Sequence, residues 1–243
     1  MSQSLIFIAL LALVLLLVLF AAGLYRSRKR EERIRETVER KNIENEVSVL
    51  KNQMSPHFIL NTINNISSLM DYDKERAKEL LIKFGDLLRY STYEVKNHKV
   101  KLASTLDYLD KYLELQQLRF GDKEVLRYSV QGSSEGKHIA PMILLPFIEN
   151  AFKYGARYGK DKPAISIDIT IEENNLCLMV GNYIKSQQRY VDKGIGIKNT
   201  TKRLKLIYPN QHNLDIYNDG TQFNVKLEIK DLSNGEENKL YSS

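Results

Sequence analysis

An uninterrupted apolar run near the N-terminus limits the folds open to this chain. Leu5 to Tyr25 is 21 residues long and holds no charged and no strongly polar side chain. At a rise of ~1.5 Å per residue, a helix of this length covers the ~30 Å hydrocarbon core of a bilayer. The run therefore predicts a transmembrane helix within residues 1–25.

Basic residues flank this run on one side only. No Lys or Arg precedes it, whereas Arg26, Arg28, Lys29 and Arg30 follow it at once. The positive-inside rule then predicts a single-pass protein of the inner or cytoplasmic membrane, with its N-terminus outside and everything after Tyr25 in the cytoplasm. A cleaved signal peptide is the alternative, but such a peptide carries its basic residues before a shorter apolar core.

The net charge of +6, from 36 Lys+Arg and 30 Asp+Glu, comes largely from the adjoining stretch. Residues 26–41 hold eight basic and four acidic side chains, so the remainder is nearly neutral. This placement argues against a nucleic-acid-binding protein. The single cysteine, Cys177, excludes a disulfide framework and a Cys-rich metal site, and the four histidines argue against an all-His metal centre.

Residues 26–54 are predicted to form a dimeric coiled-coil stalk. Ile43, Val47, Leu50 and Met54 follow the 4-3-4 spacing of a helical seam. A single solvated helix is the alternative, because the seam is short.

The dipeptide Ser55-Pro56 interrupts this helical pattern. Proline inside a helix removes a hydrogen bond and costs ~3 kcal/mol. It therefore either kinks the helix or starts a new one, with Ser55 as the cap and Pro56 in the first turn. Both outcomes place His57 at a local irregularity of the backbone.

Residues 55–120 are predicted to form a helical hairpin through which two chains dimerise. Further amphipathic helices are expected at 75–92 and 102–119. In the helix after Pro56, one stripe at helical spacing is apolar and another is polar. The apolar stripe consists of Ile59, Ile63, Ile66 and Met70, and the polar stripe of His57, Asn61, Asn64 and Ser68.

After residue 120 strands and helices alternate. This order predicts an α+β domain over residues 121–232, with helices on one face of a mixed sheet, followed by a flexible tail, residues 233–243. The expected strands are 124–130, 164–172, 176–182, 214–218 and 222–229, with turns at Asn174-Asn175 and Asp219-Gly220. The expected helices are 140–154, with Pro141 near its start, and 197–208.

His57 is the first candidate for chemistry. A neutral, exposed imidazole can act as a nucleophile at cytoplasmic pH. If Ser55-Pro56 begins a helix, its free backbone N–H groups would favour a phosphate on His57. A histidine that is merely hydrogen-bonded within a polar stripe is the alternative.

The second candidate group lies in the string PFIENAFKYG, with Glu149, Asn150, Lys153 and Tyr154 on a helix. Asn150 and Lys153 share a face because they are three residues apart. An amide oxygen beside an ammonium suits magnesium and nucleotide phosphates. Glu149 could orient water or accept a proton. Ordinary helix surface is the alternative.

The third group is Gly194, Gly196, Lys198 and Asn199, at the start of a basic helix. Glycines before a helix N-terminus let backbone amides approach phosphate oxygens. The preceding polar segment, residues 185–193, is typical of a mobile lid. A Walker A motif and a protein-kinase catalytic loop are both missing from the sequence, which excludes these two phosphotransfer architectures.

Five strings occur in the order seen in LytS-type (YehU-like) sensor histidine kinases: QMSPHFILNTINN, LLRYS, YLELQQLRFGD, PFIENAFKYG and GIGIKNTTKRLKLIYP. The chain resembles this family over about residues 50–230. The resemblance implies a Bergerat-type (GHKL) α/β sandwich that binds Mg-ATP, and autophosphorylation of His57 within a homodimer. It also implies transfer of the phosphoryl group to an aspartate of a response regulator, usually one with a LytTR DNA-binding domain.

The same resemblance implies roles for individual residues. His57 would be the phosphoacceptor and Asn150 the magnesium ligand, with Glu149 beside it. The other residues expected at the nucleotide are Lys153, Tyr154, Asn182, Gly194, Gly196, Lys198, Asn199, Arg203, Gly220 and Thr221.

Two positions depart from the pattern. Many related ATPases read the adenine amino group with an Asp, where this chain has Asn182, which can still accept a hydrogen bond through its amide oxygen. His57 is followed by Phe58 instead of an acidic residue, so catalysis would rest on positioning and magnesium, with Glu149 as a substitute base. A degenerate nucleotide-binding scaffold without kinase activity is the alternative function.

Overall fold

A computed structural model gives the fold of the chain and describes residues 25–26, 28–30, 33, 56–94, 97–120, 125–155, 163–184 and 195–232. The chain divides into two compact units, Met1–Val47 and Ser48–Ser243. In the first unit, the described residues are helical. No helix in the described part of the chain is both long and apolar enough to span a bilayer.

Several predictions lie outside the described residues. These are most of the predicted membrane run (5–24), the seam of the predicted stalk (43–54), the predicted lid (185–193), Gly194, and the tail (233–243).

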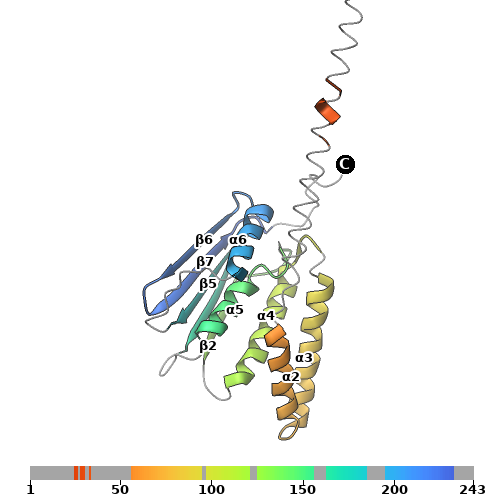
Figure 1. Cartoon of the computed structure of the whole chain (residues 1–243), viewed down its shortest axis with the longest axis vertical. Coiled ribbons are helices and arrows are strands. Elements are labelled where there is room, and N and C mark those ends of the chain that lie inside the picture. The colour runs from red at the N-terminus through yellow and green to blue at the C-terminus, as the bar shows by residue number, and fades with distance from the viewer. Residues whose placement is uncertain are drawn as a thin grey trace, which may run out of the picture. The chain divides into compact units, whose positions relative to one another are not determined.

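The second unit begins with three helices that lie side by side (Figure 1). They are α2 (Pro56–Leu69), α3 (Lys74–Tyr93) and α4 (Leu102–Gln117), the last followed by a short 3-10 helix, η2 (Leu118–Phe120). Asp73 caps α3, because its Oδ1 accepts a hydrogen bond from the backbone N–H of Arg76 at 3.0 Å. The predicted helices at 75–92 and 102–119 are confirmed to within two residues.

The predicted apolar stripe of α2 is only partly correct. Ile66 is buried, but Ile63 is 45% exposed and Met70 is 44% exposed. The buried face is set by Phe58, Thr62 and Ile66, which are four residues apart. The helix packs through this face, and its second apolar side faces solvent in the described chain.

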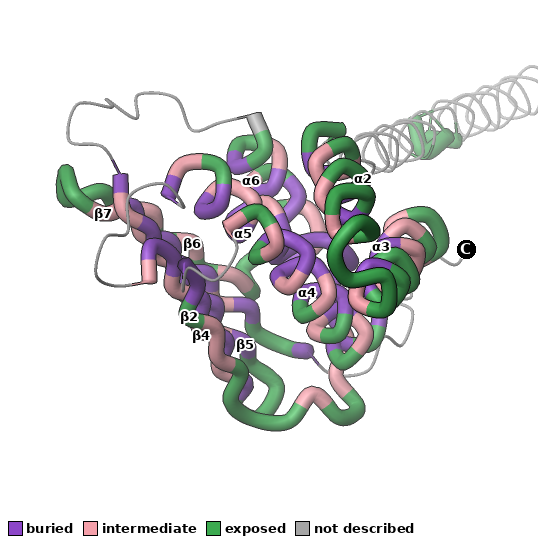
Figure 2. The backbone as a smooth tube through the Cα atoms, turned by 90° about the horizontal axis from the view of Figure 1, so that it is seen from below, coloured by how far each residue is buried: buried purple, intermediate pink, exposed green. Residues whose placement is uncertain are grey.

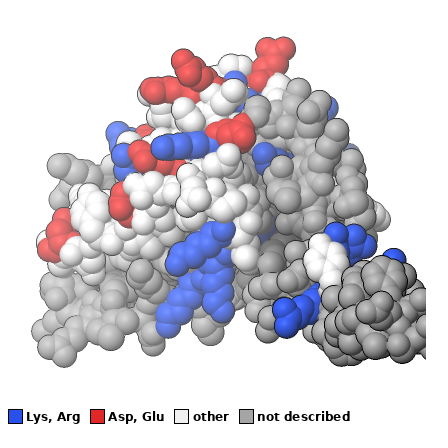
Figure 3. All heavy atoms as spheres, turned by 90° about the horizontal axis from the view of Figure 1, so that it is seen from above, with Lys and Arg blue, Asp and Glu red and all other residues white. Residues whose placement is uncertain are grey.

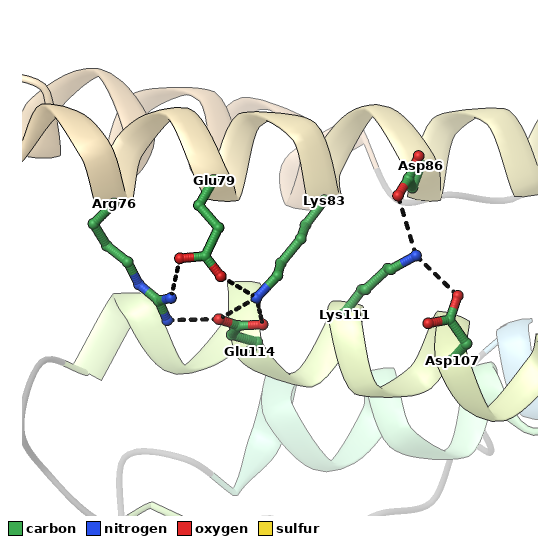
Figure 4. Close-up of polar contacts among 7 residues, drawn as sticks. All are labelled: Arg76, Glu79, Lys83, Asp86, Asp107, Lys111 and Glu114. Atoms are coloured by element: carbon green, nitrogen blue, oxygen red, sulfur yellow. Dashed lines mark hydrogen bonds and ion pairs between the residues drawn. The ribbon is translucent and has the colours of Figure 1, made fainter.

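The two helices α3 and α4 are joined by charged side chains (Figure 4). Glu114 of α4 accepts hydrogen bonds from both Arg76 and Lys83 of α3, and Glu79 bridges the same two cations. One turn further along, Lys111 of α4 donates to Asp86 of α3 at 3.1 Å.

The rest of the second unit is a mixed five-stranded sheet in the order β2-β4-β5-β7-β6. The strands are β2 (Leu126–Gln131), β4 (Ile165–Glu172), β5 (Asn175–Tyr183), β6 (His212–Asn218) and β7 (Gln222–Ile229). Strands β2 and β4 are parallel and the other neighbours are antiparallel. Two short strands, β1 (Val100–Lys101) and β3 (His138–Ile139), pair separately.

Helices α5 (Leu145–Tyr154) and α6 (Ile195–Ile207) lie along one face of the large sheet (Figure 1). Alternate residues of the central strands are buried, as in the run Ile165, Ile167, Ile169 and Ile171. Buried residues line the side of the sheet that faces the helices (Figure 2). The predicted α+β architecture with a mixed sheet is therefore confirmed.

Two local predictions are wrong. Helix α5 begins at Leu145 and not at residue 140, because Met142 has a φ of 59° and Pro146, instead of Pro141, occupies the first turn. In the first hairpin Glu172 pairs with Asn175, so the turn is Glu173-Asn174 and not Asn174-Asn175. The predicted turn at Asp219-Gly220 is confirmed, and Gly220 has the φ of 90° that favours glycine.

Candidate functional site

His57 is the second residue of α2 and is exposed, as a nucleophile must be. The Nδ2 atom of Asn61, one turn along the helix, lies 3.0 Å from Nδ1 of His57 and 3.3 Å from its Nε2. The next residue, Phe58, is buried, with its ring centroid 4.7 Å from that of Tyr112 on α4. The backbone at His57 is thus anchored while its imidazole stays accessible. The i,i+4 spacing predicted that Asn61 lies on the same side of the helix as His57, but it did not predict the contact between Asn61 and the imidazole ring.

Helix α5 carries the second candidate group. Its apolar side chains, among them Phe147 and Ile148, are buried, whereas Asn150 is half-buried and Lys153 is exposed. The Nζ atom of Lys153 lies 5.0 Å from the ring centroid of Tyr154, within the range of a cation–π contact. An amide and an ammonium are therefore available at the outer side of this helix.

Glu149 lies in a different environment from Asn150. Its Oε1 atom is buried and makes no hydrogen bond within the described part of the chain. Burial raises the pKa of Glu149 to about 7. Burial, and then the charge of Glu149, raise the pKa values of Tyr108 and Tyr112, so the carboxyl is within electrostatic reach of α4.

Asn182, near the end of β5, is 3% exposed and belongs to the face of the sheet that the helices cover. Its Nδ2 donates to the carbonyl oxygen of Tyr183 at 3.0 Å, which identifies the other amide atom as the oxygen. That Oδ1 is buried and has no partner among the described residues. A buried acceptor left unpaired costs ~1–3 kcal/mol, so the site is suited to a donor from a ligand.

Gly155, directly after α5, lies against Asn182. A Cβ atom on Gly155 would be 2.4 Å from Cβ of Asn182, so only glycine permits this approach. The end of the helix that carries Asn150 and Lys153 therefore meets the end of the strand that carries Asn182.

The turn between β6 and β7 lies at the same end of β5. The N–H of Ile184, two residues beyond Asn182, donates to the carbonyl oxygen of Thr221 at 2.9 Å. Asp219 fixes this turn by accepting from the N–H groups of Thr221 and Gln222 and from the Thr221 hydroxyl. These hydrogen bonds, with that of Gln222 the largest contribution, hold the pKa of Asp219 below its ordinary value. The structure thus brings Gly220 and Thr221 close to Asn182.

Helix α6 carries the remaining candidates on two different sides. Gly196 and Lys198 are exposed and Asn199 is half-buried. A Cβ atom on Gly196 would meet nothing within 4 Å, which leaves open space for a ligand. Lys202 and Lys205 are also exposed, and basic side chains gather in one patch on the face of the molecule shown in Figure 3.

Arg203 points the other way. It is 3% exposed, and its Nη2 donates to the carbonyl oxygen of Pro141 at 2.7 Å. Burial lowers its pKa to about 10, so the guanidinium is still charged at neutral pH. The structure therefore places Arg203 against the segment that precedes α5, a contact that the sequence did not indicate.

These groups fit a magnesium nucleotide. The unpaired oxygen of Asn182 can accept from the amino group of adenine, and Asn150 offers the hard oxygen that magnesium prefers. Among the described residues, no group of three His, Cys, Asp or Glu side chains could hold a metal ion by itself. Such an ion would therefore depend on nucleotide oxygens as well as on Asn150.

Comparison with known proteins identifies the family that the chain resembles. Residues 45–135 match the family described as histidine kinase. Sensor protein LytS from Staphylococcus saprophyticus is 26% identical over 213 residues, which are 82% of this chain and 36% of the relative. The resemblance to LytS-type sensor histidine kinases is confirmed.

Two further relatives extend the comparison. LytS from Staphylococcus haemolyticus is 30% identical over 135 residues, which are 56% of this chain and 23% of that protein. Sensor protein kinase HptS from Staphylococcus aureus is 29% identical over 180 residues, which are 73% of this chain and 32% of that protein. The chain thus spans between 23% and 36% of the length of these LytS and HptS proteins.

Proposed function

We propose that the chain is a membrane-anchored, homodimeric sensor histidine kinase of a two-component system. It would transfer the γ-phosphoryl group of ATP to His57, and then to an aspartate of a response regulator, of the LytTR type. The observation that carries the proposal is the buried, unpaired Oδ1 of Asn182 beside the end of α5. It supports nucleotide binding, and phosphoryl transfer to His57 is what separates a kinase from a nucleotide-binding scaffold.

The nucleotide would lie between α5, α6 and the end of β5. Asn182 would accept from the adenine amino group, with Gly220 and Thr221 next to the base. Asn150 would bind magnesium, which neutralises the charge on the phosphates during transfer. The phosphates would face Lys153, Tyr154, Gly194, Gly196, Lys198 and Asn199.

The chemistry at His57 needs little from the protein beyond position. A lone pair of the imidazole forms the N–P bond while the bond from the γ-phosphorus to the β,γ-bridging oxygen breaks, and ADP leaves. The proton on the other ring nitrogen is then lost to a base or to water. Asn61 contacts the ring and would hold it in one orientation. Glu149, with a pKa of about 7, has the proton affinity of a general base near neutral pH.

Exposed apolar side chains on the hairpin support a homodimer. Leu60 and Ile63 of α2 are 62% and 45% exposed, and Leu81 and Ile82 of α3 are 48% and 60% exposed. Leu60 and Ile63 are three residues apart and share one side of α2, whereas Leu81 and Ile82 are neighbours on α3. We call these four exposed residues the apolar strip of the hairpin. A second copy of the hairpin would bury this strip, as in a four-helix bundle.

Phosphate labelling tests the proposal. The full chain in lipid nanodiscs, given Mg²⁺ and γ-labelled ATP, should gain acid-labile, base-stable phosphate. His57→Gln should abolish the label, whereas His98→Gln, at another exposed histidine, should keep it. Equal labelling of the two variants would exclude His57 as the acceptor. Nucleotide binding without any labelling would favour the scaffold.

A further inference from the structure

Two side chains hold the backbone segment that leads into α5. One is Arg203 of α6, and the other is Tyr208, the residue directly after that helix. The hydroxyl of Tyr208 accepts a hydrogen bond from the N–H of Ala140 at 2.7 Å. Arg203 donates to the carbonyl oxygen of the next residue, Pro141, also at 2.7 Å. Arg203 is 3% exposed and Tyr208 is 1% exposed, so both contacts are shielded from water.

The segment that they hold has no regular structure of its own. Residues 140–144 lie between β3 and α5, and Met142 has a φ of 59°. All five residues are buried. The hydrogen bonds of Ala140 and Pro141 come from side chains that are 68 and 62 residues away in sequence. The position at which α5 begins therefore depends on α6.

Arg203 is an unusual residue for a purely structural contact. Its Nε atom is buried without a partner, and no acidic side chain in the described part of the chain pairs with it. A buried, unpaired cation is costly, and an apolar residue would fill the same space more cheaply. Unlike an apolar side chain, the guanidinium of Arg203 holds the carbonyl group of Pro141 at a fixed distance from α6.

We propose that Arg203 and Tyr208 are positioning residues that set α5 in register with α6 for magnesium-dependent nucleotide binding. This inference rests on the proposed function. The N-terminal half of α6 carries Gly196, Lys198 and Asn199, and α5 carries Asn150. If the segment before α5 moves, Asn150 moves as part of a rigid helix. A displacement of ~1 Å is enough to disrupt a bound geometry of this kind.

The test compares nucleotide binding with and without magnesium. The full chain in nanodiscs is titrated with a non-hydrolysable ATP analogue, once with excess Mg²⁺ and once with EDTA. Arg203→Met should weaken binding in Mg²⁺ by about tenfold, as expected for losing a charged hydrogen bond, and weaken binding in EDTA by less, because Lys153 and Tyr154 move with Asn150 but the magnesium contact is already absent. Arg203→Lys should restore part of the loss. Lys78→Met, at an exposed lysine of α3, should match the unaltered chain.

Tyr208→Phe removes one hydroxyl and keeps the ring, so it tests the inference even if Arg203→Met does not fold. It should weaken binding in Mg²⁺ in the same direction and by less. An equal loss with and without Mg²⁺, or no loss in any variant, would overturn the inference while leaving the kinase proposal intact. Absence of binding by the unaltered chain would overturn the proposed function, and the inference with it.

Discussion

Lys83 of α3 and Glu114 of α4 form an ion pair, with 2.7 Å between Nζ and Oε2 (Figure 4). Glu114 also accepts from Arg76, so one carboxylate faces two cations of the opposite helix. The Glu114 side chain is 28% exposed, which reduces the screening that weakens surface pairs. This pairing fixes the register of α3 against α4.

Replacing Glu114 should therefore loosen the helical part of the chain. Glu114→Gln removes the charge and leaves Glu79 as the one carboxylate that the structure shows between Arg76 and Lys83. We expect a loss of ~1 kcal/mol in the free energy of unfolding, near the upper end for partly exposed pairs. Denaturant unfolding measures it, and Glu135→Gln in an exposed loop is the control. Equal stability of the two variants would contradict the role of the pair.

The same network should make stability fall in acid. Hydrogen bonds from Lys83, and then from Arg76, hold the pKa of Glu79 below its ordinary value. The folded state thus binds the proton of Glu79 more weakly than the unfolded state. The stabilisation is fully present above the ordinary glutamate pKa of ~4.3 and is lost as the pH falls through the lower, folded-state pKa.

Thermal unfolding measured between about pH 6 and pH 3 checks this prediction. Glu79→Gln should flatten the acid side of the curve, because the titrating group is gone. Glu135→Gln should retain the original slope. A steeper acid limb in Glu79→Gln would show that the sign is wrong.

A substitution of Asn182 should lower the affinity for ATP without a matching loss in the free energy of unfolding. Asn182→Leu removes a buried oxygen that has no partner, together with the hydrogen bond to the Tyr183 carbonyl. These two effects oppose each other, so we expect a change in unfolding free energy within ~1 kcal/mol. ATP affinity should fall about tenfold or more, because the adenine amino group loses its acceptor. Calorimetric titration and thermal unfolding of one preparation give both values, and parallel losses would indicate a structural role.

A charged residue introduced into the exposed apolar strip of the hairpin should weaken the association of two chains into a dimer. Ile63→Glu would put a carboxylate into the proposed dimer interface, and we expect at least tenfold weaker self-association from burying an unpaired charge. Met179→Glu, at a residue that is 47% exposed on β5, is the matched control. Sedimentation of the full chain in detergent measures the association. Unchanged self-association of Ile63→Glu would place the dimer contact elsewhere.

Local patterns were sufficient to predict most of the fold. The Asp219-Gly220 turn lies where the sequence places it, because a left-handed backbone favours glycine. Helices α3 and α4 agree with their apolar spacing to within two residues. Exposure of His57 could also be predicted, since it belongs to a polar stripe of an amphipathic helix.

The features that could not be predicted from the sequence involve contacts between residues that are far apart in the chain. Both Pro141 and Pro146 are suited to a first helical turn, but the helix begins at Leu145, and the segment before it is held by hydrogen bonds from Arg203 and Tyr208. The resemblance implies a place at the nucleotide for Arg203, and the structure buries its side chain against Pro141. No pattern within α6 distinguishes it from the exposed Lys202 beside it.

Phe58 and His57 are joined by one peptide bond and lie in opposite environments. The phenyl ring packs between Phe84 and Tyr112, while the imidazole lies in water. The backbone at His57 therefore cannot move away from α3 and α4 without pulling an aromatic ring out of the interior, which costs ~1.5–3 kcal/mol. We expect the acceptor to stay fixed relative to α3 and α4, so a stimulus would change the reaction rate by moving the phosphate donor against α2, α3 and α4.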